Sequence, residues 1–277
     1  MSGFDCHTHT YLSNHGTGTV EEVVAAAERL GMQAVALTEH LPLPAEVDRD
    51  SCFAMREDDV STYLHDVAEA RDAHPGIEVI CGVEIDWRWG AEDYILKRIA
   101  PFELRLGSVH MLTDEAGNSW EFDHPDYVGG WYERGVEKVW ERYLELWLQA
   151  LRSAVPFDVM AHADLPKKLG FKPQFDTREL YGTMAAAVAS KGCMVEVNTS
   201  GLRKPVGEMY PAPALLKAFC DAGVPCTLGS DAHVPSDVGR DFDIACALLR
   251  SAGYTHATRP TRDGDRVPVP LEELASA

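Results

Sequence analysis

Histidine and acidic side chains recur at the ends of short apolar segments in this chain. Histidine is the commonest metal-binding side chain, and carboxylates complete the set of ligands that zinc, manganese or iron takes in proteins. Six of seven such segments lead into residues of this kind, which makes nine candidate ligands. They are His7, His9, His15, His40, Glu84, His110, His162, Asp231 and His233. Since one ion needs about four ligands, the pattern predicts a hydrolase that binds more than one metal ion.

Two pairs of these ligands have the spacing of one strand face. Side chains alternate between the faces of a strand, so His7 and His9 point the same way. Asp231 and His233 repeat this spacing near the other end of the chain. If the first and last strands lie side by side, the two pairs can share one cluster. This conjunction favours metal binding over the ordinary role of a lone core histidine.

The apolar segments have the composition of buried strands. They are rich in β-branched residues, which is typical of strands covered on both faces. Their predicted ranges are Gly3–His9, Gln33–Glu39, Glu78–Ile85, Leu104–His110, Phe157–His162, Met194–Asn198 and Pro225–Gly229. Helices are predicted between and after them at Val20–Leu30, Asp58–Ala73, Ala91–Ile99, Gly130–Ala154, Asp176–Ser190, Ala212–Ala222 and Ser236–Ala252. The alternation predicts a parallel sheet with right-handed crossovers.

The placement of the ligands favours a closed sheet. An open α/β sheet gathers its site at a switch point near the middle, whereas here the first and last strands both supply ligands. A TIM-like (β/α)7 barrel brings those two strands together and presents its site at the carboxyl ends of the strands. No linker or repeat interrupts the pattern, so we expect a single domain over residues 1–277, with residues 254–277 as a C-terminal surface tail.

Composition limits the partners. The chain has 44 acidic and 25 basic residues and a net charge of −19, which repels a phosphate backbone and disfavours nucleic acid. No stretch approaches the roughly 18 apolar residues that a membrane span needs. Seven scattered cysteines without a C-x-x-C pair, and no visible signal peptide, predict a cytoplasmic protein. The remaining histidines, His65, His74, His124 and His256, are expected to be exposed, and His124 could instead lie near the mouth of the site.

Six segments together resemble the PHP (polymerase and histidinol phosphatase) family. They are DCHTHT (Asp5–Thr10), ALTEH (Ala36–His40), GVE (Gly82–Glu84), GSVH (Gly107–His110), AH (Ala161–His162) and GSDAH (Gly229–His233), with His15 after the first. The resemblance implies a distorted seven-stranded barrel with two to three divalent ions. It implies one ion at His7, His9, Glu84 and Asp231, a second at Glu84, His110 and His162, and a third at His15, His40 and His233. Glu84 would bridge the first two.

Within this family the chain looks most similar to the histidinol-phosphate phosphatases. The similarity lies in SNHG (Ser13–Gly16), EVNTSGLRKP (Glu196–Pro205) and SDAH (Ser230–His233) followed by DVG (Asp237–Gly239). It implies hydrolysis of L-histidinol phosphate to L-histidinol and phosphate, as a step in histidine biosynthesis.

The chemistry of the predicted site suits a phosphate monoester. Bound metals neutralise phosphate and lower the pKa of a bridging water toward ~7, and the resulting hydroxide would attack phosphorus. The predicted catalytic residues are Glu84, Asp231 and His233, and for proton handling Asp231 is the first candidate and Asp86 the second. The predicted substrate contacts are Arg203, which matches phosphate bidentately, and Lys167, Lys168 and Asn198.

Other readings stay open at this point. The chain could be another PHP phosphoesterase, acting on phosphotyrosine or on a phosphodiester, or a non-catalytic domain that metal stabilises. An amidohydrolase-type deaminase also begins with His-x-His, but it normally has eight strands and a carbamylated lysine. The sequence does not identify the oligomeric state.

Overall fold

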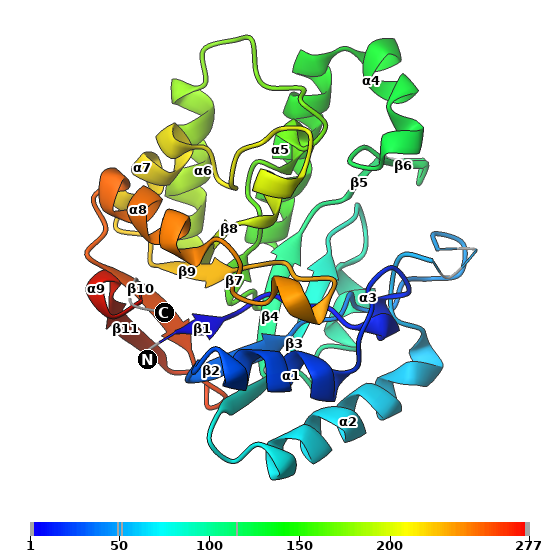
Figure 1. Cartoon of the computed structure of the whole chain (residues 1–277). Coiled ribbons are helices and arrows are strands. Elements are labelled where there is room, and N and C mark those ends of the chain that lie inside the picture. Colours follow the sequence, from blue (N-terminus) through cyan, green and yellow to red (C-terminus); the bar gives the residue numbers. More distant parts are fainter. Residues whose placement is uncertain (1–2, 49, 51, 115, 275–277) are drawn as a thin grey trace.

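The computed structural model describes residues 3–274 except 49, 51 and 115, and the statements below concern these residues. Seven parallel strands form one sheet in the order of the chain (Figure 1). They are β1 (Phe4–Asp5), β2 (Ala34–Leu37), β3 (Glu78–Asp86), β4 (Leu104–Ser108), β7 (Val159–Met160), β8 (Met194–Asn198) and β9 (Cys226–Gly229). All seven predicted strands are therefore confirmed, although most are shorter than predicted.

The sheet closes on itself between its first and last strands. The Cys6 amide donates to the Leu228 carbonyl at 3.0 Å. Just beyond the strands, the Asp231 amide donates to the His7 carbonyl at 2.8 Å, and Thr8 and Ala232 form a parallel bridge. These bonds confirm the predicted seven-stranded barrel and place the two ligand pairs next to each other.

Helices cover the outside of the barrel. They are α1 (Val20–Arg29), α2 (Val60–Ala73), α3 (Glu92–Leu96), α4 (Gly129–Arg134), α5 (Val136–Arg152), α6 (Arg178–Lys191), α7 (Pro213–Asp221) and α8 (Phe242–Ala252). Short 3₁₀ turns lie at Tyr11–Ser13, Glu57–Asp59, Pro125–Tyr127, Leu165–Lys167, Ser200–Arg203 and Pro235–Asp237. The α1 helix begins with a capping box in which Thr19 and Glu22 each bond the other's backbone amide.

The structure differs from two predicted helices. The predicted helix at Gly130–Ala154 is two helices, because Gly135 adopts a positive φ of 84° that ends α4. The helix predicted at Ser236–Ala252 begins only at Phe242. Sequence reasoning also missed a hairpin of β5 (Met111–Thr113) and β6 (Ser119–Glu121), which follows the ligand His110.

The C-terminal segment corrects the prediction of a surface tail for residues 254–277. Strands β10 (His256–Pro260) and β11 (Arg266–Pro270) form an antiparallel hairpin, and the short helix α9 (Leu271–Leu274) follows. The hairpin packs beside β9, and Ala257 and Val269 are fully or almost fully buried. The tail is thus a packed part of the fold, apart from residues 275–277, which lie outside the described residues.

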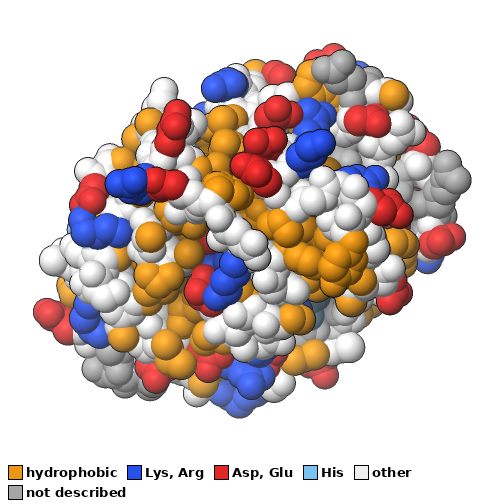
Figure 2. All heavy atoms as spheres, turned by 90° about the horizontal axis from the view of Figure 1, so that it is seen from above, with side chains coloured by type: hydrophobic (Ala, Val, Ile, Leu, Met, Phe, Trp, Pro, Cys, Tyr) orange, Lys and Arg blue, Asp and Glu red, His pale blue; other side chains and the backbone are white. Residues whose placement is uncertain are grey.

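Charges of both signs share the surface. On the face in Figure 2, Lys and Arg side chains lie among Asp and Glu side chains and apolar ones. The described residues form no continuous basic stripe on this face.

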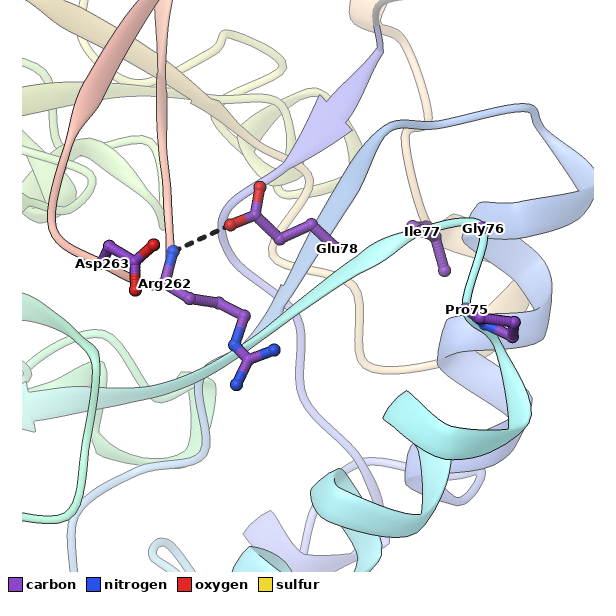
Figure 3. A pocket seen from close by; sticks show the side chains of 6 residues that line it. All are labelled: Pro75, Gly76, Ile77, Glu78, Arg262 and Asp263. Atoms are coloured by element: carbon purple, nitrogen blue, oxygen red, sulfur yellow. Dashed lines mark hydrogen bonds between the residues drawn. The ribbon is translucent and has the colours of Figure 1, made fainter.

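A hollow at the amino end of the barrel is held by ion pairs. It is lined by Pro75, Gly76, Ile77, Glu78, Arg262 and Asp263 (Figure 3). Glu78, the first residue of β3, accepts a hydrogen bond from the Arg262 amide at 2.9 Å and pairs with the Arg259 guanidinium. The hairpin is thereby tied to the barrel by charge as well as by apolar packing.

Two further expectations can be compared with the structure. Among the described residues, no helix combines the length and the apolar character that crossing a bilayer requires. The prediction of four exposed histidines is wrong for His74, which is buried between two glutamates: Nε2 lies 2.8 Å from Glu21 and Nδ1 2.7 Å from Glu28. His65 is largely exposed.

Candidate metal centre

The predicted ligands converge at the carboxyl ends of the strands. Four overlapping groups have donor atoms that all lie within 4.8 Å of one another. They are His7, His9 and Asp231; His7, Glu84 and His162; His9, His40 and His233; and His40, Asp86 and His110. The ring of His15 lies 4.8 Å from that of His233 and 5.3 Å from that of His40, between centroids. The structure thus brings all nine predicted ligands together.

Glu84 lies at the centre of the cluster. One carboxylate oxygen, Oε1, is 2.9 Å from His162 Nε2. The other, Oε2, is 3.2 Å from His7 Nε2 and 3.3 Å from His9 Nε2. Burial raises the pKa of this carboxyl, but the surrounding histidines, His40 first, outweigh it and hold the pKa well below its usual range. An ionised carboxylate with histidine nitrogens beside both oxygens could hold a metal ion on each side.

Two more carboxylates orient the ligand rings from behind. His7 Nδ1 lies 2.8 Å from Glu196 Oε1, and the same carboxylate accepts a hydrogen bond from the His162 amide at 3.0 Å. Asp86 lies 3.0 Å from His40 Nδ1 and also contacts His110 Nδ1. Because a carboxylate only accepts, each Nδ1 donates its proton to the carboxylate, so Nε2 is the nitrogen that a metal would use.

Glu196 was absent from the predicted site residues. Its signal was present, since it points inward from β8 two residues before Asn198. The carboxylate fits beside β9 because residue 229 is a glycine: a Cβ there would lie 1.8 Å from Glu196 Oε1. Asp86 appeared in the sequence only as a proton-handling candidate, whereas the structure makes it the common partner of His40 and His110.

Backbone strain gathers at the cluster. His162 and Asp231 adopt positive φ angles of 24° and 52°, which non-glycine residues avoid. Each residue lies just beyond a buried strand, His162 after β7 and Asp231 after β9, with one residue between, and both are candidate ligands. Strain of this kind persists only where the surrounding structure enforces it, which is typical of functional sites.

The histidines fall into two electrostatic groups. Burial lowers the pKa of His9, but the bonds to Asp231 and Glu84 outweigh it and raise the pKa to about 9. In the same way Asp86 and Glu84 raise the pKa of His110 to about 10. His15 has the opposite shift, because burial and then the neighbouring His40 and His9 lower its pKa to about 3. The carboxylates thus draw positive charge into the cluster, and the convergent donor set fits divalent metal ions.

A cavity of about 810 Å³ opens above the cluster. Glu84, His110, His162, Asp231 and His233 face it. Its walls carry three kinds of side chain: aromatic (Phe53, Tyr127 and Tyr210), basic (Lys168 and Lys204) and acidic (Glu121, Asp123 and Asp126). A small charged molecule could therefore reach the ligands and meet groups of both signs.

Three of the predicted substrate contacts do not line the cavity in this structure. Arg203 lies outside the cavity lining, where its guanidinium donates to the Ser230 carbonyl at 2.8 Å and pairs with Asp237 at 3.3 Å. Lys167 is buried, with its ammonium 2.6 Å from Glu208 and 2.9 Å from Asp164. Both cations are already paired with groups of the fold in this structure, and their role as substrate contacts stays a prediction.

Asn198 is the third of these residues. It is fully buried, and its amide donates to Glu196 at 3.0 Å and to Asp231 at 3.3 Å. It therefore positions two carboxylates of the centre and does not line the cavity.

Two lysines do face the cavity. Lys168 was predicted, and its Nζ lies 2.7 Å from Asp123 Oδ2. Lys204 was missed, although it stands next to Arg203 in the sequence. Its ammonium forms no hydrogen bond or ion pair with the described residues, and burial lowers its pKa. Lys204 is thus a free cation in the wall of the cavity, where an anion could bind.

Comparisons with known proteins agree with this geometry. Residues 5–200 match the family model of the PHP domain. The chain is 36% identical over 258 residues to a Deinococcus radiodurans protein named as a probable histidinol-phosphatase, a match that covers 91% of this chain and 95% of that one. It is 26% identical to the histidinol-phosphatase of Bacillus subtilis, over 88% and 98% of the two chains.

A solved structure has the same fold. It is the histidinol phosphate phosphatase of Lactococcus lactis in complex with zinc, L-histidinol and phosphate. Its TM-score to this chain is 0.75 at 21% identity, and the match covers 94% of this chain and 97% of that one. The family match over residues 5–200, together with the converging ligands, establishes that this chain belongs to the PHP domain family.

Proposed function

We propose that this chain is a metal-dependent phosphomonoesterase that hydrolyses L-histidinol phosphate to L-histidinol and phosphate. The main support is the cluster of candidate metal ligands around Glu84, which lies at the base of a cavity with basic and acidic groups in its walls. The relatives from Deinococcus radiodurans and Bacillus subtilis, which carry this activity in their names, support the choice of substrate.

The bound metals and the cavity have separate tasks. When bound, divalent ions neutralise the phosphate and lower the pKa of a coordinated water toward ~7. Lys168 and Lys204 would hold the remaining phosphate oxygens at the wall. Glu196 and Asp86 keep the ligand rings in place, so the centre is already organised when the substrate enters.

Asp231 is our candidate for accepting a proton near the reacting atoms. Burial raises the pKa of its carboxyl, but His7 and the neighbouring histidines outweigh this and keep the pKa well below its usual range. It is therefore ionised, and an ionised carboxylate takes up a proton rather than donating one. Ser200 Oγ donates to it at 3.0 Å and Asn198 at 3.3 Å, which fixes its orientation. His233 faces the same cavity, and burial holds its pKa well below the usual value, so it is a neutral ligand.

The sequence alternatives carry less support. A phosphodiesterase that acts on nucleic acid would have to bind a polyanion on a chain with a net charge of −19. A non-catalytic domain would not need an open cavity above the ligands. We also propose that the whole chain acts as one domain on a small-molecule ester, without nucleic acid. Its seven free cysteines support the cytoplasm as its location.

A panel of substrates tests the function. Protein reconstituted with zinc, manganese or iron would be assayed with L-histidinol phosphate, p-nitrophenyl phosphate, a phosphotyrosine peptide and bis(p-nitrophenyl) phosphate. We expect L-histidinol phosphate to have the highest kcat/KM and chelation to abolish the activity. A higher kcat/KM for the diester or the peptide would refute the proposal.

A further inference from the structure

Two carboxylates in the cavity wall have no part in the metal centre. Glu121 ends β6 and Asp123 follows two residues later, and both line the cavity. Phe122 between them is fully buried. Its amide bonds to the His110 carbonyl at 3.4 Å, which ties this segment to a metal ligand. The two acids therefore stand beside the reaction centre, on an element that the strand pattern did not predict.

Their charge is only partly compensated. Asp123 is 3% exposed, and its Oδ2 holds the Lys168 ammonium at 2.7 Å. The other oxygen, Oδ1, is buried and has no hydrogen-bond partner among the described residues. An unpartnered buried carboxylate oxygen is costly unless a ligand satisfies it.

Glu121 adds a second unmatched charge. Its half-buried carboxylate forms no hydrogen bond or ion pair with the described residues. Burial, and then the charge of Asp123, raises the pKa of Glu121, whereas Lys168 and His110 outweigh burial and lower the pKa of Asp123. A positively charged group between them would relieve both costs.

We infer that Glu121 and Asp123 bind the cationic nitrogen end of the substrate and thereby select phosphate esters that carry an N–H cation. This rests on the proposed function, because L-histidinol phosphate has a protonated amine in the middle of the molecule, as close to the ester oxygen as in O-phosphoethanolamine, and an imidazole at the end opposite to its phosphate. Lys168, Lys204 and the metals take the phosphate, and Asp123 Oδ1 and the Glu121 carboxylate accept hydrogen bonds from nitrogen. The cavity thus discriminates by charge at both ends of a short molecule.

The test compares substrates in Glu121→Gln, Asp123→Asn and the double variant. Three esters share a phosphate: L-histidinol phosphate, O-phosphoethanolamine, which has the amine without the imidazole, and p-nitrophenyl phosphate, which has neither. We expect kcat/KM for L-histidinol phosphate, divided by that for p-nitrophenyl phosphate, to fall about 10- to 100-fold in each single variant, as for a lost charged hydrogen bond. Metal content is measured alongside.

The second amine ester identifies the nitrogen. If the corresponding ratio for O-phosphoethanolamine falls as well, the acids bind the ammonium. If it stays and only L-histidinol phosphate is affected, they bind the imidazole. Either result supports the inference.

Asp126→Asn is the matched control. Asp126 lines the same cavity, but its side chain is 84% exposed. An equal fall of the ratio in Asp126→Asn would overturn the inference, because the substrate would then respond only to the overall charge of the cavity. Unchanged ratios in all variants would also overturn it, because the two acids would then have no effect on substrate choice.

The proposed function can be refuted independently of the role of the two acids. This is the outcome if the wild type cleaves O-phosphoethanolamine but not L-histidinol phosphate. The ratio for the amine ester then still tests the two acids. A wild type that cleaves neither amine ester overturns both.

Discussion

The two ends of strand β3 show opposite uses of the same side chain. Glu78 begins the strand at the amino end of the barrel, where it pairs with Arg259 and accepts a bond from the Arg262 amide. Glu84 lies near the carboxyl end, where four histidine rings lie within 3.3 Å of its oxygens. Glu78 is therefore paired with arginine, which is always charged, whereas Glu84 is surrounded by histidines, which can bind a metal ion.

The same contrast holds for the regions around these residues. At the amino end, Glu103 pairs with Arg71 and Glu78 with Arg259, so that acids and cations match within the fold. At the carboxyl end, Glu84, Asp231 and Glu196 are surrounded by imidazoles instead. Burying acids without permanent partners costs free energy, and this cost is offset if divalent ions enter. The difference teaches that the amino end serves stability and the carboxyl end serves ligand binding.

The sharpest way to break this comparison is to neutralise the two glutamates in turn. Glu84→Gln removes the charge that we expect to bridge two metal ions, and kcat should fall about 1,000-fold or more with loss of bound metal, as for a lost preorganised electrostatic contact. Glu78→Gln is the matched control on the same strand and should keep both metal and activity. Metal analysis and steady-state kinetics measure the two effects. Equal losses in both variants would show that the strand as a whole, rather than its carboxyl end, is sensitive.

The pH dependence of metal binding is the next largest effect. In the metal-free protein His9 and His110, with pKa values of about 9 and about 10, carry protons that a metal must displace. The apparent affinity for zinc should therefore rise with pH, roughly tenfold per pH unit for each proton released, and level off above these pKa values. Calorimetry between pH 6 and 8 in buffers of different ionisation enthalpy counts the protons.

Two variants separate the groups of histidines. His110→Gln should lower the number of released protons by about one. His15→Gln should weaken binding without changing that number, because His15 has a pKa of about 3 and is already neutral. If zinc binding releases the same number of protons from His110→Gln and His15→Gln, the prediction is wrong.

A smaller effect on metal affinity is expected from Glu196, whose carboxylate holds a ligand ring but is not itself a predicted ligand. Glu196→Gln keeps the shape of the side chain but removes the charge that holds His7 Nδ1–H, and should reduce metal affinity about 10- to 100-fold. Glu208→Gln changes a carboxylate that pairs with Lys167, away from the ligands, and should leave metal affinity within about twofold. Competition with a chromogenic chelator measures both. If Glu196→Gln binds metal as the wild type does, His7 is held by the fold alone.

The sequence was a good guide to the ligands because strand geometry places them. His7, His40 and His162 follow buried strands whose apolar pattern is strong, and Glu84 lies near the carboxyl end of such a strand. Parallel strands present their carboxyl ends at one edge of the barrel. The substrate contacts were harder, because loops decide them. Arg203 and Lys204 are neighbours in the sequence, and only the folded loop shows that the first turns to acids and the second to the cavity.

Two other misses have the same physical origin. The C-terminal hairpin pairs with itself and packs on the barrel, so its order comes from tertiary contacts rather than from the charged, proline-bearing sequence. The β5–β6 hairpin that carries Glu121 consists of two three-residue strands, too short for a periodic signal.

The smallest expected effect concerns the outside of the barrel and tests whether histidines there are purely structural. The hydrogen bonds of His74 to Glu21 and then to Glu28 raise its pKa. A raised pKa stabilises the fold below the ordinary imidazole pKa of about 6.5, and this stabilisation is lost as pH rises through the higher folded-state value. Both glutamates are about half exposed, so His74→Ala should cost only about 0.5–1 kcal/mol at pH 6, and less at pH 9.

His65→Ala on the same helix is the control, since His65 pairs with Glu69 at 3.4 Å and both side chains are largely exposed. Urea unfolding at the two pH values should show a change for His74→Ala and almost none for His65→Ala. Metal content should be unchanged in both, because neither ring belongs to the cluster. A loss of metal in His74→Ala would contradict the division between the ligand-binding carboxyl end and the stabilising remainder of the barrel.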